Sequence, residues 1–165
     1  MKAISAQWFV CKIRYKKVME DGVQKRVTES YVIDALSFTE AEERITEEMS
    51  QYISGEFEVR DITLAPYREV FFSGEVSDDR WYKAKVAFIN IDEKTMKEKR
   101  SNQNYLLQAA TLNRAVKNID DVMSSGITSY LISSISETPI EDVFVYRIKN
   151  DDASHREDEK SITNK

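Results

Sequence analysis

The chain repeats itself, because residues in its first half recur 73 or 74 positions later in its second half. Both one-residue changes of the offset fall between regular elements, where loops tolerate insertions. A repeat of this length indicates two copies of one structural unit, which strongly limits the possible folds. The pairs that define it are Trp8-Phe9 with Trp81-Tyr82, Lys25-Arg26 with Lys99-Arg100, Tyr31 with Tyr105, Ile45 with Ile119, Pro66 with Pro139 and Val70-Phe71 with Val143-Phe144.

Each copy contains the same series of predicted elements. In the first copy, alternating apolar and polar residues predict strands over 8–18 and 26–35, with a turn at Asp21-Gly22 between them. The spacing Thr39-Glu-Ala-Glu42 predicts a capping box at the start of a helix, and Asn113 takes the cap position in the second copy. A third strand is predicted over 57–64 and a short fourth strand over 68–72.

This pattern predicts an α+β fold made of tandem duplicated ββαβ(β) units, with antiparallel sheets and one helix per copy. A single helix covers few strands, so we expect a pseudo-two-fold pseudodimer, with either one extended sheet or two packed sheets. We assign residues 1–75 to the first copy, 76–149 to the second, and 150–165 to a polar tail that we expect to be disordered.

Several segments resemble an uncharacterised family of small proteins of unknown function found in Bacteroidota and in their phages and mobile elements. The similarity covers about residues 7 to 146 and is most specific in the stretch Ala35-Leu-Ser-Phe-Thr-Glu-Ala-Glu42. Other similar segments are Trp8 to Lys12, Arg80 to Lys85 and Ser133 to Thr138. The resemblance implies a role in a phage or mobile element, without an activity or catalytic residues.

The composition excludes several kinds of chemistry. The 165 residues include one cysteine, one histidine and four glycines, too few for a histidine-based triad, a multi-cysteine zinc site or a glycine-rich phosphate loop. Cys11 fits a buried, unreactive thiol in a strand. We therefore expect a protein that is not an enzyme and uses no cofactor or metal. No segment has the length of a signal peptide or a membrane span, so we expect a cytoplasmic protein and no membrane partner.

The first strand of each copy has a face that combines a tryptophan with cations. Aromatic rings interleaved with Lys and Arg on a sheet are typical of surfaces that stack bases and neutralise phosphates. The same tryptophans could instead pack between the copies or anchor a protein partner. The candidate binding residues are Trp8, Lys12 and Arg14 in the first copy, and Trp81, Lys83 and Lys85 in the second.

Basic residues also flank the two predicted hairpins. A basic hairpin can follow a nucleic-acid backbone, but charged hairpins also resist edge-to-edge aggregation, and acids lie beside these cations in the sequence. The basic runs are Lys16-Lys17, Lys25-Arg26 and Lys97 to Arg100, of which Lys25, Arg26, Lys99 and Arg100 are the candidate contacts.

The net charge of −5 is unevenly distributed, with −4 in residues 1–75, +1 in 76–150 and −2 in the remainder. A general nucleic-acid binder is usually basic, so any such contact must be local. Our first hypothesis is an accessory protein of a phage or mobile element that binds nucleic acid or nucleotides. The alternative is a protein-interaction or assembly module that modulates a host protein through an exposed strand edge or through the acidic first helix, at Glu40, Glu42, Glu43, Glu47 and Glu48.

Overall fold

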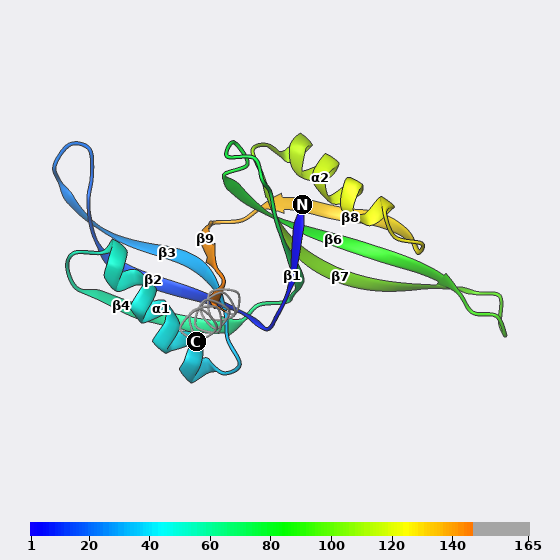
Figure 1. Cartoon of the computed structure of the whole chain (residues 1–165), viewed down its shortest axis with the longest axis horizontal. Helices are drawn as coiled ribbons and strands as arrows, with labels where there is room; N and C mark the ends of the chain where they lie inside the picture. The colour runs from blue at the N-terminus through cyan, green and yellow to red at the C-terminus, as the bar shows by residue number, and fades with distance from the viewer. Residues whose placement is uncertain (147–165) are drawn as a thin grey trace, which may run out of the picture. The chain divides into compact units, whose positions relative to one another are not determined.

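The computed structural model describes residues 1–146 and contains both predicted helices (Figure 1). The predicted polar tail at 150–165 lies outside the described residues. The fold is α+β and mostly strands, arranged in two sheets. In chain order the elements are β1 (Lys2–Ser5), β2 (Trp8–Val18), β3 (Gln24–Asp34), α1 (Phe38–Tyr52), β4 (Phe57–Leu64), β5 (Tyr67–Phe72), β6 (Arg80–Ile91), β7 (Glu98–Ala109), α2 (Leu112–Ser124), β8 (Ser129–Glu137) and β9 (Ile140–Phe144).

The chain forms two compact units, which we name after their helices. The α1 unit contains residues 7–65 and the described residues from 142 onward, and the α2 unit contains residues 1–6 and 66–141. Their boundaries differ from the predicted copies at 1–75 and 76–149. The chain leaves the α1 unit at Pro66, directly after β4, and returns to it within β9.

In the α1 unit, the strand order is β4-β2-β3-β9. The strands β2 and β3 form a long antiparallel hairpin, with Trp8 opposite Asp34 at one end and Val18 opposite Gln24 at the other. Alternation places every second residue of β2 under α1, as the sequence predicted. The buried core between sheet and helix consists of Phe9, Cys11, Ile13, Ile33, Ala35, Ala41, Ile45, Met49 and Phe144.

In the α2 unit, the strand order is β1-β5-β7-β6-β8. The expectation of purely antiparallel sheets is wrong here, because β5 runs parallel to β7. Strands joined by a tight hairpin turn must run antiparallel. β5 is not joined to β7 by such a turn, and it runs in the same direction as β7. The buried core under α2 consists of Phe71, Tyr82, Ala84, Val86, Tyr105, Leu107, Ala109, Ala115 and Ile119.

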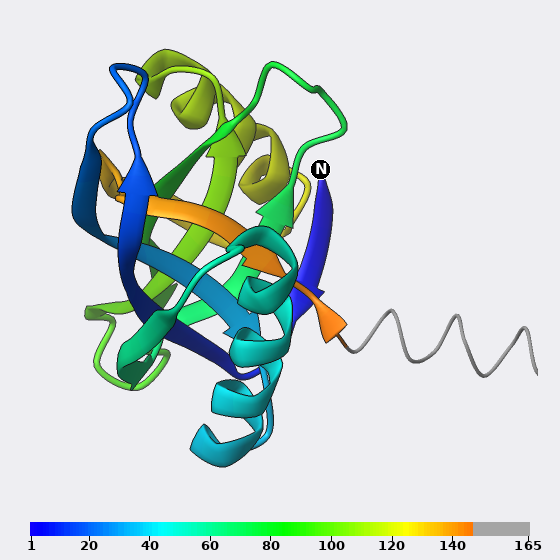
Figure 2. The same ribbon diagram turned by 90° about the vertical axis from the view of Figure 1, so that its left-hand side faces the viewer.

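Each sheet therefore contains a strand that is not consecutive in the sequence with its neighbour in the sheet. β9 lies next to β3 in the α1 unit, and β5 lies next to β7 in the α2 unit. An aromatic pair attaches each of these strands to its sheet. Tyr31 stacks on Phe144 with ring centroids 5.7 Å apart, and Phe71 stacks on Tyr105 at 5.4 Å. Both views show α1 lying along its own sheet and α2 along its own (Figures 1 and 2).

The N-cap of each helix lies two residues before the predicted cap position. Ser37 caps α1 by accepting a hydrogen bond from the backbone N–H of Glu40 at 3.1 Å. Thr111 caps α2 in the same way, accepting from the N–H of Arg114 at 3.2 Å. The predicted caps Thr39 and Asn113 are therefore wrong, because a residue with extended backbone and a free side-chain oxygen already ends the loop upstream.

The Ser37 cap gives a direct stability prediction. We expect Ser37→Ala to lower the free energy of unfolding by about 1 kcal/mol, because the Glu40 N–H would lose its partner. Thr39→Ala should change it by only a few tenths of a kcal/mol, since Thr39 lies within the helix and alanine is the better helix former. Urea unfolding followed by circular dichroism measures both variants, and equal losses would contradict the assignment.

Candidate nucleic-acid interface

The two candidate tryptophans are almost fully buried. Trp8 is 1% exposed and Trp81 is 2% exposed. Trp81 packs edge-on against Phe72 with ring centroids 5.4 Å apart. The backbone carbonyl of Trp8 accepts from the N–H of Ala65 at 2.8 Å, and that of Trp81 accepts from Thr138 at 2.9 Å. The tryptophans hold the strand ends together, and neither presents a ring on which a base could stack.

The cations on the same strand face have a different environment. The sheet face opposite α1 is buried at the Trp8 end, but Lys12 and Lys16 are exposed and Arg14 is half-exposed. Arg26 of β3 is exposed and lies directly opposite Lys16 in the register. None of these four side chains has an acidic partner within ion-pair distance among residues 1–146. We call Lys12, Arg14, Lys16 and Arg26 the basic strand face.

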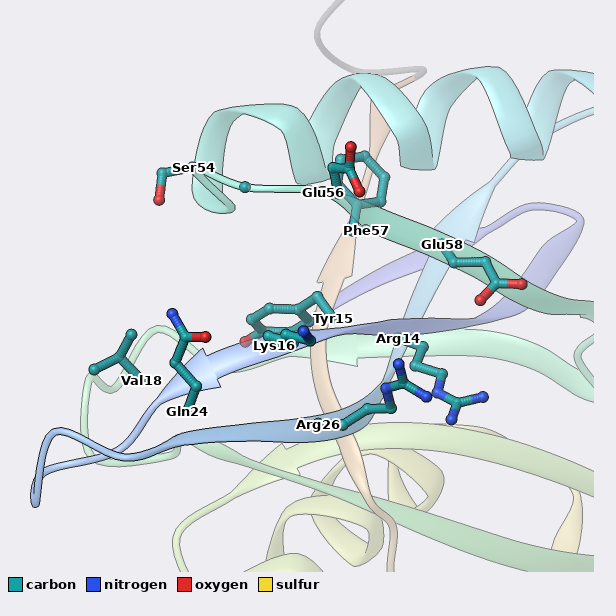
Figure 3. A pocket seen from close by; sticks show the side chains of 11 residues that line it. Arg14, Tyr15, Lys16, Val18, Gln24, Arg26, Ser54, Glu56, Phe57 and Glu58 are labelled. Atoms are coloured by element: carbon teal, nitrogen blue, oxygen red, sulfur yellow. The ribbon is translucent and has the colours of Figure 1, made fainter.

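Three members of the basic strand face border a hollow of about 540 Å³ (Figure 3). The hollow lies where β4 begins. The pairing of β2 with β4 ends at Tyr15 and Phe57, so the rest of β2 has a free edge on this side. Figure 3 shows the guanidinium groups of Arg14 and Arg26 gathered on one side of the hairpin, with Tyr15 lying on β2 and Phe57 below α1. The hollow therefore combines two neighbouring guanidinium groups, an ammonium group and two aromatic edges.

Acidic residues occupy the β4 side of the hollow. Glu56 and Glu58 line it, and Glu58 lies opposite Arg14 in the register but pairs with Arg60 at 3.3 Å. Lys16 and Arg26 face each other as like charges, an arrangement that costs stability unless an anion lies between them. The geometry suits a phosphate or carboxylate bound on the β2–β3 side of the hollow.

The equivalent surface of the α2 unit is not basic in this way. Lys83 is half-buried and Lys85 is exposed, but the next positions on that face are Ala87 and Ile89. Two of the hairpin cations are neutralised locally, since Lys99 lies 3.5 Å from Asp92 and Arg100 lies 3.4 Å from Glu98.

Only part of the predicted site is thus brought together by the fold. Lys12, Arg14 and Arg26 share one face of the α1 unit, whereas Lys25 lies on the other side of β3, opposite Lys17. Lys16 belongs to the face but was named only as part of a basic run. The signal that could have identified it is the alternation Lys12, Arg14, Lys16 along one strand.

The acidic helix is only partly available to a partner. Glu42, Glu43 and Glu47 are exposed. Glu40 forms an ion pair with Arg44. Glu48 is 4% exposed and accepts a hydrogen bond from the Tyr146 hydroxyl at 2.8 Å. Burial and the Glu48 carboxylate together raise the pKa of Tyr146, so Glu48 is part of the core rather than of the surface.

Candidate metal ligands and the Cys11 thiol are the remaining reactive groups in the described part of the chain. Residues 1–146 contain no group of three or more His, Cys, Asp or Glu side chains that could hold a metal ion. Burial raises the pKa of Cys11 to about 12, which agrees with the predicted unreactive thiol. None of the described helices is both long and apolar enough to cross a bilayer.

The fold and the site define an α+β protein with one locally basic strand face. The chain belongs to the family described as "Domain of unknown function (DUF4494)", whose model matches residues 7–146. No curated protein and no solved structure matches the chain.

The burial of the tryptophans predicts their fluorescence. We expect the emission of the folded protein to be blue-shifted from that of the urea-unfolded chain and to resist quenching by iodide, because water and ions do not reach the rings. An oligonucleotide that binds the basic strand face should leave this emission nearly unchanged. If an oligonucleotide quenched the folded protein as strongly as iodide quenches the unfolded chain, a base would have to lie on a tryptophan.

Proposed function

We propose that this protein binds the sugar–phosphate backbone of nucleic acid through the basic strand face. The observation that supports this is the set of four cations, Lys12, Arg14, Lys16 and Arg26, on one face without an acidic partner among the described residues. A phosphate chain would neutralise the opposed pair Lys16 and Arg26. Its binding would release counterions, which makes the contact favourable and sensitive to salt.

The proposal differs from the one that the sequence suggested. Base stacking by Trp8 and Trp81 is no longer part of it, since both rings are buried. Contacts to phosphates alone position a protein on nucleic acid without reading its sequence. We therefore expect weak sequence preference and a local contact of a few phosphates, as an acidic chain with one basic face would give.

We further propose that the two units arose by duplication and that each copy contributes its fourth strand, β5 or β9, to the other copy's sheet. Three kinds of paired contact support this. The helix caps Ser37 and Thr111 are 74 positions apart, and the carbonyl acceptors Trp8 and Trp81 are 73 apart. The stacked rings exchange partners between copies, Tyr31 with Phe144 and Phe71 with Tyr105.

With the nucleic-acid contact we also propose an accessory role in a phage or mobile element and a cytoplasmic location.

Binding of fluorescent single- and double-stranded oligonucleotides, measured by anisotropy over a range of salt concentrations, tests the nucleic-acid proposal. Removing two phosphate contacts with Arg14→Ala and Arg26→Ala should weaken binding at low salt by at least about tenfold. It should also make the slope of log K against log salt less negative by about 1.4 to 1.8.

The α2 unit offers a matched control. Lys99→Ala with Arg100→Ala also removes two cations from a hairpin, but these cations are already paired with Asp92 and Glu98. This control should keep near wild-type affinity. Absence of any binding at low salt, or equal losses in the two double variants, would contradict the proposed interface.

A second candidate is supported by the surface beside the helix. Leu36 is 78% exposed and Phe38 is 55% exposed at the start of α1, close in sequence to the exposed acids Glu42 and Glu43. Apolar side chains rimmed by charge are typical of protein-binding surfaces. A basic protein partner that covers these residues would make the chain an interaction module.

This alternative predicts that a specific host protein co-purifies with the chain. Glu43→Lys with Glu47→Lys should abolish its recovery by reversing the exposed charge, whereas Asp121→Lys on α2 should not. Glu48 must be left unchanged, because its substitution would disturb the core contact with Tyr146. Equal recovery with all variants, or with an unrelated bait, would exclude this surface.

A further inference from the structure

In the α1 unit, a carboxylate fills a space between two tyrosines. The Glu29 carboxylate accepts hydrogen bonds from the hydroxyls of Tyr15 and Tyr31, the latter at 3.0 Å. The Lys17 ammonium lies 3.9 Å from the same carboxylate, and the Glu29 side chain is 12% exposed. Glu29 lies opposite Ile13 in the register, which places it on the side of the sheet that α1 covers.

The α2 unit keeps one tyrosine of this arrangement and loses the acid. Tyr105 lies opposite Ala84, as Tyr31 lies opposite Cys11, and two residues earlier Gln103 stands in the position of Glu29. Phe88 replaces Tyr15 in the same register, opposite Ser101.

Tyr105 is left without the partner that Tyr31 has. Its side chain is 4% exposed and its ring stacks on Phe71. Within residues 1–146 its hydroxyl makes no hydrogen bond. Burial raises the pKa of Tyr105, so the hydroxyl stays protonated at neutral pH and can donate. Trp8 Nε1 is the buried side-chain polar atom that lacks a partner within residues 1–146, so the Tyr105 hydroxyl reaches the surface and can donate to an acceptor in the space beside it.

A hollow of about 360 Å³ lies beside this hydroxyl. Phe88 gives it an apolar wall, and Ser101 and Thr128 add hydroxyl groups. Its charged members are Arg68 and Glu69, which are adjacent in β5. The register of β5 shifts between Tyr67 and Glu69, so that Arg68 has no residue of its own opposite it in β7. Such a bulge redirects a side chain, and here it lets a cation and an anion border one hollow.

We propose that this hollow binds a small molecule that carries both a carboxylate and an ammonium group, such as a free α-amino acid with an apolar side chain. The carboxylate accepts from the Tyr105 hydroxyl and pairs with Arg68. The ammonium group pairs with Glu69, which would repel a simple carboxylate. The apolar side chain lies against Phe88.

Isothermal titration calorimetry of the full chain with three related probes tests the proposal. L-Leucine has both charged groups, 4-methylpentanoate lacks the amino group, and isoamylamine lacks the carboxylate. We expect measurable binding of L-leucine and at least about tenfold weaker binding of each of the other two, since each leaves one charged side chain unpaired.

Tyr105→Phe removes only the donor and should weaken L-leucine binding roughly fivefold to tenfold. Tyr31→Phe is the matched control, because its hydroxyl is already satisfied by Glu29 in the other unit, and it should leave L-leucine binding unchanged. Circular dichroism of both variants checks that they fold. No heat of binding with millimolar L-leucine, equal affinity for 4-methylpentanoate, or an unchanged affinity in Tyr105→Phe would each overturn the proposal.

Discussion

The fold depends on two aromatic stacks that join segments far apart in the sequence. Phe144 lies on Tyr31 and Phe71 lies on Tyr105, and each phenylalanine comes from a strand added to the outside of a hairpin. A helix on a three-stranded sheet leaves a small core, so the additional strand supplies apolar area that the unit lacks. Arg44 and Glu48 strengthen the attachment in the α1 unit: the arginine lies over the Tyr146 ring at 5.3 Å, and the glutamate accepts from its hydroxyl.

The two units, each a helix packed on a sheet, have different electrostatic environments. In the α2 unit two of the hairpin cations are paired, and the buried Asp78 accepts from Ser73, from the Ala110 N–H and from Arg114. Burial acts to raise the pKa of Asp78, but these hydrogen bonds lower it below its usual value. In the α1 unit the Glu29 carboxylate is bound by the hydroxyls of Tyr15 and Tyr31. The cations of the basic strand face lie on the opposite side of the sheet and have no acidic partner within ion-pair distance among residues 1–146. The two units therefore differ both in net charge and in where their charges lie.

Much of the framework could be predicted because it depends on local periodicity. The alternation in β2 and β4 gave their limits, and it separates Phe9 and Tyr82, which face the helices, from the cations on the opposite face. The parallel pairing of β5 could not be predicted, since no local signal distinguishes a strand that pairs with its neighbour from one that joins a distant hairpin. The burial of Trp8 and Trp81 was left open for the same reason, because the pattern of one strand does not show what covers its second face. Ser37 was missed because two overlapping cap signals, at 37 and 39, precede the same helix.

The position of β9 has a consequence for the order in which the chain can fold. The α1 unit contains the first long hairpin of the sequence, yet its sheet is completed by Ile140–Phe144. During synthesis the early segment must wait until the ribosome has passed residue 144, with the outer edge of β3 uncovered in the meantime. The exposed cations Lys25 and Arg26 on that strand discourage its pairing with other chains over this interval.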